Sequence, residues 1–510
     1  MCQGILIMSK SCLKFTDVTF IYDSAGEPLF EDLSLHVDAG WMGVIGPNGA
    51  GKTTLLKLAA GLLDPAAGRV TCRGDTVYCA QRTDHVPDEF GQMLADNARD
   101  AQIIKSHLDI SDDWIDRWGT LSHGQRKRAQ IATALWSKPA VLAVDEPTNH
   151  LDGEGREFVA KALSLFDGIG LLVSHDRELL DSLCRRCLFI RPPEVILRPG
   201  GYTHALAAIE CEQQSIENLR NVEKRALKRL QREATKRSQL AAGAQKRRSK
   251  RNLAPRDSDG REKKDRVRVS GKDATGGRLR RQLQGRLDQA RSQLGELKVQ
   301  KQYELGIWLP ACRSKRNVLL EIESGSLGLG PERKLRYPHL TITPTDRIAI
   351  TGPNGSGKST LIRHILPLVN APKDRVTYIP QEIDMARCQR VLEQARQLAG
   401  ERLGHLMNIV SRLGSWPERM LHSEMPSPGE TRKLLLALGM TRAPHLIVMD
   451  EPTNHMDLPS IECLEQALAD CPSALILVSH DERFLNTLTR TRWNIAEDHD
   501  SAGGFMLVLE

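Results

Sequence analysis

The sequence predicts an α/β fold in which two copies of one domain are joined by a helical connector. Motifs in the first part of the chain return in the same order in the last part, mostly after a short apolar run typical of a buried parallel strand. Between these parts, no Phe, Trp or Tyr occurs from residue 203 to residue 302, so this stretch is not expected to build a core of its own. We therefore divide the chain into a first domain at 1–205, a connector at 206–311 and a second domain at 312–510.

The repeat is visible in three pairs of segments. GPNGAGKTT, which begins at Gly46, returns as GPNGSGKST, which begins at Gly352. DEPTNHLD returns as DEPTNHMD, and LLVSHDRELL returns as LILVSHDERFL. Agreement in both order and spacing indicates a duplicated domain rather than unrelated short matches.

The first pair of segments predicts two phosphate-binding loops, and hence two tandem domains of the P-loop NTPase class. Each segment fits G-x-x-x-x-G-K-[ST], follows an apolar run and precedes a helical stretch. In such a loop, main-chain N–H groups and a helix N-terminus bind phosphate oxygens. Lys52 and Lys358 are expected to bridge the β- and γ-phosphates, and Thr53 and Ser359 to ligate Mg²⁺. The predicted nucleotide-binding residues of the loops are Gly46, Asn48, Gly49, Gly51, Lys52, Thr53, Thr54, Gly352, Asn354, Gly355, Gly357, Lys358, Ser359 and Thr360.

Polar residues at the ends of two further apolar runs predict the groups that act on the nucleotide. Asp145 and Asp450 end the runs VLAVD and LIVMD, a place that suits a magnesium ligand facing the phosphate loop. The glutamate after each aspartate is expected to orient or deprotonate the attacking water. A histidine after another apolar run in each copy is expected to bond that water or the γ-phosphate. The catalytic residues predicted in this way are Glu146, Glu451, His175 and His480.

The stretches LSHGQ and PSPGE, one in each copy, predict the start of a helix. Ser122 and Ser427 are favoured N-cap residues, and Gln125 and Glu430 stand three residues later, as in a capping box. Pro428 falls at the first helical position, where its ring is tolerated but removes one main-chain N–H. Two interpretations stay open: a helix start aimed at a phosphate, or a well-capped helix with no phosphate role.

The connector is predicted to form two helices with a basic tip between them. RLRRQLQGRLDQARSQLGELK places apolar residues at alternating four- and three-residue steps, a seam typical of paired helices. A weaker seam runs through the stretch 209–244, and the residues between the two seams are polar, basic and interrupted by Pro and Gly. The alternative is a flexible charged spacer, which has no use for a seam. The predicted seam positions are Leu283, Leu287, Ala290, Leu294 and Leu297 in the later helix and Ile216, Leu219, Ala226 and Leu230 in the earlier one.

The charge is unevenly placed along the chain. Residues 211–300 carry 26 Lys and Arg against 11 Asp and Glu, a formal +15, whereas the remainder carries 45 against 53, a formal −8. A basic segment between two mildly acidic bodies favours a polyanionic partner. RNA is such a partner, because its phosphates attract Lys and Arg through counterion release.

These motifs resemble those of ATP-binding-cassette (ABC) proteins. Two DEPTNH segments, a charged helical connector and no membrane domain make the whole chain similar to the F-type (ABC-F) family. The resemblance implies a cytoplasmic ATPase that needs Mg²⁺, a monomer whose cassettes pair head to tail around two ATP molecules. It also implies action on the ribosome, with the connector contacting rRNA and tRNA, either as a translation factor or as an antibiotic-resistance protein that dislodges drugs.

The same resemblance assigns further residues to the two sites. It implies that the signature residues of each cassette bind the γ-phosphate of the ATP held by the opposite cassette. These residues are Ser122, Gly124, Gln125, Ser427, Gly429 and Glu430. It gives contacts with Mg²⁺ and water to Gln81 and Gln381, and a place across the cassette interface to Asp152 and Asp457. Tyr22 is where the family stacks an aromatic ring on adenine, whereas the second copy offers only Leu327 and Leu329. Because the site of Lys52 pairs with PSPGE, we expect it to close more slowly or weakly than the site of Lys358.

Two other functions stay open. A transporter ATPase subunit would need a coupling surface for a membrane partner, and it has no reason for a basic helical pair. A DNA-associated ATPase would share the basic segment. The apolar runs are too short to span a membrane, and MCQGILIMSK lacks the leading basic region of a signal peptide. Cys184 and Cys187 form a lone CxxC, which is expected to be two thiols at a helix–strand junction rather than a zinc site.

Overall fold

The computed structural model describes residues 12–22, 26–149, 151–192, 194–248, 282–292, 312–330, 333–415, 417–422, 427–454, 456–498 and 504–510. The chain falls into two compact units. One unit combines residues 1–205 with residues 304–510 and holds both copies of the repeat, and the other is formed by residues 206–303.

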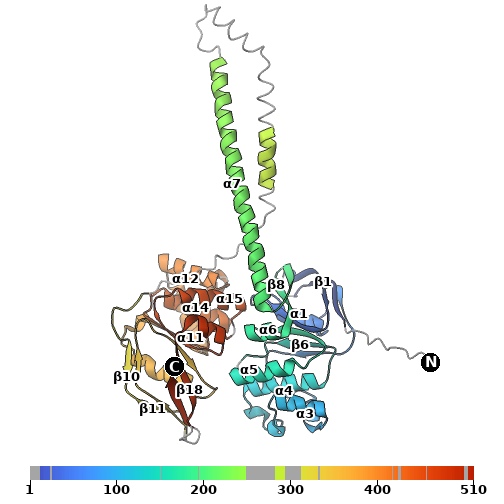
Figure 1. Ribbon diagram of the computed structural model, residues 1–510, viewed down its shortest axis with the longest axis vertical. Coiled ribbons are helices and arrows are strands. Elements are labelled where there is room, and N and C mark those ends of the chain that lie inside the picture. The colour runs from blue at the N-terminus through green and yellow to red at the C-terminus, as the bar shows by residue number, and fades with distance from the viewer. Residues whose placement is uncertain are drawn as a thin grey trace, which may run out of the picture. The chain divides into compact units, whose positions relative to one another are not determined.

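A six-stranded sheet with the order β5-β6-β7-β3-β8-β9 forms the base of the first repeat (Figure 1). Neighbouring strands are parallel except β8 and β9, which are antiparallel. Because β3, β6 and β7 are parallel, the residues that follow them meet at one edge of the sheet. The strands are β3 (Gly40–Ile45), β5 (Thr76–Cys79), β6 (Val141–Asp145), β7 (Ile169–Val173), β8 (Cys184–Arg191) and β9 (Glu194–Pro199).

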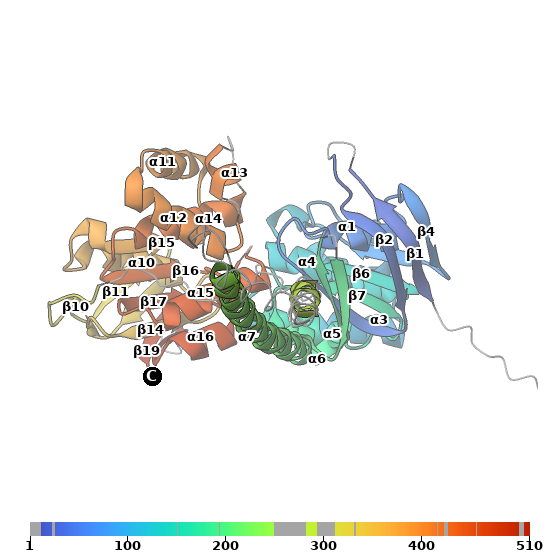
Figure 2. The same ribbon diagram turned by 90° about the horizontal axis from the view of Figure 1, so that it is seen from above.

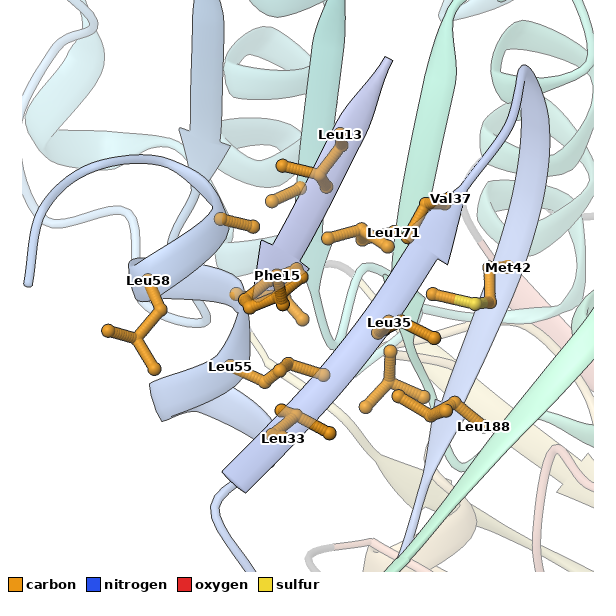
Figure 3. Close-up of a cluster of buried hydrophobic side chains, with 14 of the residues drawn as sticks. Leu13, Phe15, Leu33, Leu35, Val37, Met42, Leu55, Leu58, Leu171 and Leu188 are labelled. Atoms are coloured by element: carbon orange, nitrogen blue, oxygen red, sulfur yellow. The ribbon is translucent and has the colours of Figure 1, made fainter. Parts of the chain in front are cut away.

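A second, antiparallel sheet covers the helix that follows the phosphate loop. It has the order β2-β1-β4. Its apolar face packs with that helix and the main sheet into one buried cluster, which includes Phe15, Leu35, Leu55 and Leu171 (Figure 3). This packing fixes the position of the phosphate-loop helix, and truncating Leu55 to Ala would cost about 2–5 kcal/mol. The elements are β1 (Leu13–Phe20), β2 (Phe30–Val37), β4 (Ala67–Cys72) and the helix α1 (Lys52–Ala59).

The other helices of the first repeat connect these strands. A group of short helices between β5 and β6 leads into α4, the helix that begins at LSHGQ, and two more helices follow β6 and β7. Their bounds are α2 (Phe90–Ala95), α3 (Arg99–His107), η1 (Asp112–Trp114), η2 (Trp118–Thr120), α4 (His123–Trp136), α5 (Gly153–Leu163) and α6 (Arg177–Leu183).

The second repeat has the same parallel core. Its eight-stranded sheet has the order β11-β12-β19-β18-β14-β17-β16-β15, in which β15-β16-β17-β14-β18 matches β5-β6-β7-β3-β8 strand for strand. Two further strands, β10 and β13, pair separately. The predicted α/β class and the duplicated P-loop domain are therefore confirmed. The strands are β10 (Leu320–Ile322), β11 (Gly325–Gly328), β12 (Lys334–Tyr337), β13 (Leu340–Ile342), β14 (Arg347–Thr351), β15 (Val376–Ile379), β16 (Leu446–Asp450), β17 (Ala474–Val478), β18 (Thr491–Asp498) and β19 (Gly504–Leu509).

The helices of the second repeat include one compact group. Figure 2 shows α11, α12, α13 and α14 gathered at one end of the repeat, next to the sheet edge formed by β15. The remaining helices follow the strands, as in the first repeat. Their bounds are α10 (Lys358–Ile365), η4 (Leu366–Leu368), η5 (Lys373–Arg375), α11 (Met385–Arg396), α12 (Gly400–Arg412), α13 (Pro417–His422), α14 (Pro428–Met440), α15 (Leu458–Ala469) and α16 (Glu482–Leu488).

The connector contains the two predicted helices, within the part that is described. The first is α7 (Tyr202–Arg248), and a second helix covers residues 282–292 and lies alongside it in Figures 1 and 2. Leu283, Leu287 and Ala290 are buried, so the later seam is confirmed for these positions. Leu294, Leu297 and the predicted tip at 249–281 lie outside the described residues. Among the described helices, none has the length and apolar character needed to cross a membrane.

The earlier seam was predicted in the wrong register. Ile216 and Leu219 are 36% and 56% exposed, and Ala226 is exposed as well. Of the four predicted positions, only Leu230 lies on the half-buried face of α7. The first residues of this face are polar, and their aliphatic stems cover it. The half-buried positions on this face are Gln213, Arg220, Glu223, Leu227, Leu230 and Ala234.

Candidate active sites

Each phosphate loop leads from a buried strand into a short helix. Lys52 Nζ donates hydrogen bonds to the carbonyls of Gly46 and Pro47, at 2.8 and 3.2 Å. Lys358 repeats this arrangement with the carbonyls of Gly352 and Pro353, at 2.7 and 2.9 Å. Burial lowers the pKa of both lysines, and nearby carboxylates oppose that effect. The other predicted loop residues, Asn48, Gly49, Thr53, Thr54, Asn354, Gly355, Ser359 and Thr360, lie in the same loops or in the first turns of α1 and α10.

The last glycine of each loop is required by geometry. Gly51 and Gly357 are the N-caps of α1 and α10, with φ of 97° and 98°, a conformation that other residues rarely adopt. A Cβ atom at Gly51 would also lie 2.9 Å from Leu29, and one at Gly357 would lie 2.6 Å from Leu329. Leu329 therefore packs on its loop as Leu29 does, so we assign it as the counterpart of Leu29 rather than of Tyr22. Sequence analysis missed Leu29.

A cavity of about 360 Å³ adjoins the first phosphate loop. Tyr22 lines this cavity, and its hydroxyl lies 2.7 Å from Thr54 Oγ1, so the predicted adenine-stacking ring is beside the loop. Gln81, which follows β5, lines it too. Apart from Gly46 and the residues expected from the opposite cassette, the lining includes every nucleotide or catalytic residue predicted for this copy: Tyr22, Asn48, Gly49, Gly51, Lys52, Thr53, Thr54, Gln81, Asp145, Glu146 and His175.

The predicted magnesium ligands of each copy are close together. Thr53 donates a hydrogen bond of 2.7 Å to Asp145 Oδ2, and Tyr78 donates one of 3.2 Å to the same oxygen. Burial raises the pKa of Asp145, and the bond from Thr53 counteracts it. Burial likewise raises the pKa of Asp450, and the hydrogen bond from Ser359 counteracts it. A hydroxyl beside a buried carboxylate is a pair of hard oxygen ligands, which fits Mg²⁺.

The two glutamates differ in their partners. His175 Nε2 lies 3.0 Å from Glu146 Oε1, and the His175 main-chain N–H donates to Glu146 Oε2 at 3.2 Å. His480 Nε2 lies 3.5 Å from Glu451 Oε1, and neither oxygen of Glu451 has a hydrogen bond within the described structure. Burial raises the pKa of Glu451 to about 7. Burial also lowers the pKa of His480, to about 3, so this ring is neutral.

Both glutamates adopt a strained main-chain conformation. Glu146 and Glu451 have φ of 47° and 50°, in the left-handed region that non-glycine residues seldom occupy. Their N–H groups donate to the carbonyls of Val173 and Val478, each at 2.8 Å, and so fix each glutamate to the end of the neighbouring strand. Strain of this kind is kept where a side chain must point in one direction, which supports a functional role for both.

Groups from the two repeats meet at these sites. The main-chain N–H of Asn48, in the first phosphate loop, donates 2.8 Å to Asp457 Oδ2 of the second repeat. Burial would raise the pKa of Asp457, but Lys433 and hydrogen bonds from Ser460 and Asn48 hold it below its usual value. At the other site, the negative charge of Asp152 in the first repeat acts to raise the pKa of Lys358 in the second repeat. Each phosphate loop thus faces the aspartate that caps a helix of the opposite repeat.

Comparisons with known proteins agree with this geometry. The family model described as "ABC transporter" matches residues 30–149 and 335–454. The chain is 28% identical over 502 residues to "Ribosome protection protein VmlR" of Bacillus subtilis (strain 168), which covers 96% of this chain and 87% of that protein. It is 26% identical over 469 residues to "Erythromycin resistance ATP-binding protein MsrA" of Staphylococcus epidermidis, which covers 89% and 91%. The chain belongs to the ABC-F family.

A solved structure supports the fold of this ABC-F protein. The archaeal ribosome recycling factor aABCE1, solved in complex with the ribosomal stalk protein aP1, superposes with a TM-score of 0.62 at 16% identity and covers 96% of this chain and 89% of that chain. As an ABC-F protein with two such cassettes, the chain is an ATPase.

The signature helices of this ABC-F protein begin as predicted, but their caps differ in one respect. Ser122 and Ser427 are the N-caps of α4 and α14, and both form complete capping boxes with Gln125 and Glu430. The Ser427 hydroxyl also donates a hydrogen bond of 2.8 Å to Glu430 Oε2. A hydroxyl bonded to a carboxylate is less available to a phosphate, which strengthens the expectation of a weaker site at Lys52. Gly124 and Gly429 are buried in the first turns.

Buried cations on both of these helices were missed in the sequence, among them Lys127 and Arg432, which occupy corresponding positions. Lys127 is 3% exposed and donates to the carbonyls of Ala80 and Asp145, at 2.6 and 3.0 Å. Arg432, the corresponding residue of α14, is 4% exposed and donates to the carbonyls of Gln381 and Asn454. Each cation ties a signature helix to the loop that carries Gln81 or Gln381. The only signal was a run of basic residues after the signature, which is indistinguishable from a solvated face.

The CxxC cysteines lie where they were expected. Cys184 begins β8 directly after α6, and both thiols are buried. Burial raises the pKa of Cys187 to about 12 and the pKa of Cys184 further. Among the residues that the structure describes, no three His, Cys, Asp or Glu gather as a metal site. The two cysteines are therefore unreactive packing residues of the described structure.

Proposed function

We propose that this ABC-F ATPase acts on the ribosome in the cytoplasm, as a translation factor or as a protein that protects the ribosome from antibiotics. The observation that carries the proposal is the pairing of two ATP sites with a basic helical connector. The names of VmlR and MsrA supply the two biological settings, ribosome protection and erythromycin resistance. We further propose that the chain works as a monomer, divided into cassettes at 1–205 and 312–510 and a connector at 206–311.

In the proposed reaction, each cassette binds one ATP and cleaves its terminal phosphate. Lys52 or Lys358 leaves the loop carbonyls and bonds the β- and γ-phosphates, while the loop N–H groups surround them. Glu146 or Glu451 orients the attacking water and accepts its proton, and His175 or His480 bonds the γ-phosphate. Signature residues of the opposite cassette complete each site when the cassettes close.

Magnesium is proposed as the cofactor of both sites. Thr53, Asp145 and Gln81 would hold it in the first cassette, and Ser359, Asp450 and Gln381 in the second. Bound there, the ion neutralises charge on the phosphate oxygens. The fit rests on the short contact between a hydroxyl and a buried carboxylate, as seen for Thr53 and Asp145.

The connector is the proposed RNA-binding part of the chain. Within the described part of α7, seven Lys and Arg are exposed between residues 224 and 237 and can reach phosphate oxygens, and one of them, Arg237, also pairs with Glu233 at 2.6 Å. We propose that this surface and the basic run at 246–251, which extends past the described residues, contact rRNA and tRNA. The seven residues are Lys224, Arg225, Lys228, Arg229, Arg232, Lys236 and Arg237.

Ribosome co-sedimentation tests the proposal. The double variant Glu146→Gln and Glu451→Gln is expected to bind ATP without hydrolysing it, to remain closed, and to sediment with ribosomes only when ATP is present. If ATP leaves ribosome binding unchanged while the variant binds duplex or branched DNA, the chain is instead a DNA-associated ATPase. Expression in a susceptible bacterium with a panel of ribosome-targeting antibiotics then separates protection from a role in translation.

A further inference from the structure

Arg156 reaches from the first cassette to the active site of the second. Its Nη1 donates a hydrogen bond of 2.9 Å to the main-chain carbonyl of His480, and the same atom lies 3.8 Å from Asp176 Oδ2. In the Lys358 site, the ring of His480 lies beside the carboxylate of Glu451, with Nε2 and Oε1 3.5 Å apart. We propose that Arg156 is a positioning residue for ATP hydrolysis at the Lys358 site: it fixes the main chain of His480, whose ring lies beside Glu451.

The helix α5 explains how Arg156 arrives there. Asp152 is the N-cap of α5 and accepts a hydrogen bond from Gly155 N–H at 3.0 Å. Arg156 follows one turn later, so the two side chains are stacked on the same face of the helix. The charge of Asp152 acts on both Lys358 and His480. One helix end therefore supplies an aspartate and an arginine to the opposite site.

The second cassette has no arginine at the position that corresponds to Arg156. Asp457 is the N-cap of α15, and the residue one turn later is Ile461, which is 1% exposed. An isoleucine side chain has no donor, so it offers nothing to the carbonyl of His175. Arg156 and Ile461 both line a small cavity of about 30 Å³, next to His175 and His480. The contact is thus made in one of the two sites only.

Other contacts across the interface are one-sided in the same way. Arg177, two residues after His175, forms an ion pair of 2.8 Å with Glu465 of the second cassette. At the corresponding positions the chain has Glu482 and Ala160, which form no such pair. In these two contacts the cation comes from the first cassette and the acceptor from the second, and neither contact has a counterpart at the corresponding positions.

The inference rests on the role proposed above for Glu451, and steady-state ATP hydrolysis by variants with one intact site tests both. In a Glu146→Gln background, only the Lys358 site is expected to hydrolyse ATP. In that background, Arg156→Ile gives the first cassette the side chain that the second cassette has at the corresponding position, Ile461. We expect kcat to fall about tenfold while KM for ATP changes less than twofold, and Arg156→Lys to restore part of the rate. In a Glu451→Gln background, which leaves the Lys52 site, the same substitution is expected to change kcat less than twofold.

Glu465→Gln provides the matched control, since it weakens the other ion pair of the interface but leaves the contact with His480. An equal loss from Glu465→Gln and Arg156→Ile, an equal loss at both sites, or no loss at all would overturn the inference. If Glu451→Gln leaves hydrolysis in the Glu146→Gln background unchanged, the proposed role of Glu451 fails instead. Should Arg156→Ile not fold, Arg156→Gln and Arg156→Lys carry the same comparison, with thermal melting as the check on folding.

Discussion

At the scale of single residues, the catalytic glutamates proposed for the two sites are both buried but differ in their contacts with the neighbouring histidine. Glu146 has His175 at 3.0 Å and accepts a main-chain N–H, whereas Glu451 is buried with His480 at 3.5 Å and no hydrogen bond within the described structure. An unpaired buried carboxylate destabilises the fold when it ionises. The catalytic function assigned to Glu451 therefore carries a cost in stability.

Glu451→Gln is expected to raise the melting temperature of the nucleotide-free protein at pH 8 but not at pH 5. Burial raises the pKa of Glu451 to about 7 in the folded protein, above the value of about 4.5 for an exposed glutamate, so the folded state holds the proton more tightly. Stability thus falls as the pH rises from about 4.5 to about 7, by roughly 3 kcal/mol in total, and Gln avoids that loss. Thermal unfolding at the two pH values measures it.

Glu146→Gln is the matched control for this prediction. Because Glu146 has two groups of His175 beside it, its removal is expected to give a smaller gain at pH 8. Equal gains from both substitutions, or a gain from Glu451→Gln that does not depend on pH, would contradict the assignment of Glu451 as an unpaired buried acid.

At the scale of elements, the two signature helices begin with the same capping box built from different side chains. In α14 the N3 residue is the acid Glu430, which also accepts the Ser427 hydroxyl, whereas α4 has the neutral Gln125. An acid at a helix N-terminus stabilises the helix but repels a phosphate approaching the same end. The stability of α14 and its affinity for ATP are thus opposed.

Glu430→Gln is expected to lower KM for ATP at the Lys52 site threefold to tenfold. The substitution removes the negative charge and releases the Ser427 hydroxyl, and it gives α14 the cap that α4 has. ATP titration in a Glu451→Gln background, which leaves the Lys52 site, measures the change. The reciprocal Gln125→Glu in a Glu146→Gln background should raise KM at the Lys358 site, and a KM that is unchanged in both would refute a role for the N3 charge.

The buried cation Lys127 of α4 gives a second prediction at this scale. Lys127→Met is expected to destabilise the first cassette by about 1–3 kcal/mol, because the carbonyls of Ala80 and Asp145 lose their donor in a site closed to water. Urea unfolding measures the loss. Lys138→Met, which removes an exposed ion pair with Asp100, should leave stability nearly unchanged, because solvent screens that pair. Similar losses from both variants would show that Lys127 is no more than a surface charge.

How far the sequence predicts an element depends on what positions it. The phosphate loops, the strand-end acids and the capping boxes of Ser122 and Ser427 are determined by local chemistry, so their positions were predicted residue by residue. The earlier seam of α7 was misplaced because its face begins with Gln213 and Arg220, whose stems are half-buried although their ends are polar. Lys127 and Arg156 were missed because tertiary contacts alone distinguish a buried cation from a solvated one.

At the scale of the whole molecule, one polypeptide contains two unlike ATP sites. The Lys52 site has Tyr22 beside its loop but is proposed to pair with the proline- and glutamate-containing signature. The Lys358 site lacks that tyrosine but pairs with Ser122 and receives Arg156 across the interface. These departures need not cancel, since the roles proposed for the signature and Arg156 are in closure and hydrolysis, whereas the role proposed for Tyr22 is contact with the base.

The Lys358 site is therefore expected to carry most of the turnover. Glu451→Gln alone should remove the larger part of steady-state ATP hydrolysis, and Glu146→Gln alone the smaller part, because closure is weaker where Glu430 faces the γ-phosphate. Phosphate release at saturating ATP measures both variants against the unmodified chain, and ATP binding by each variant excludes a loss of affinity as the cause. If Glu146→Gln removes most of the turnover and Glu451→Gln little, the ranking is reversed, and the tyrosine outweighs the signature and Arg156 together.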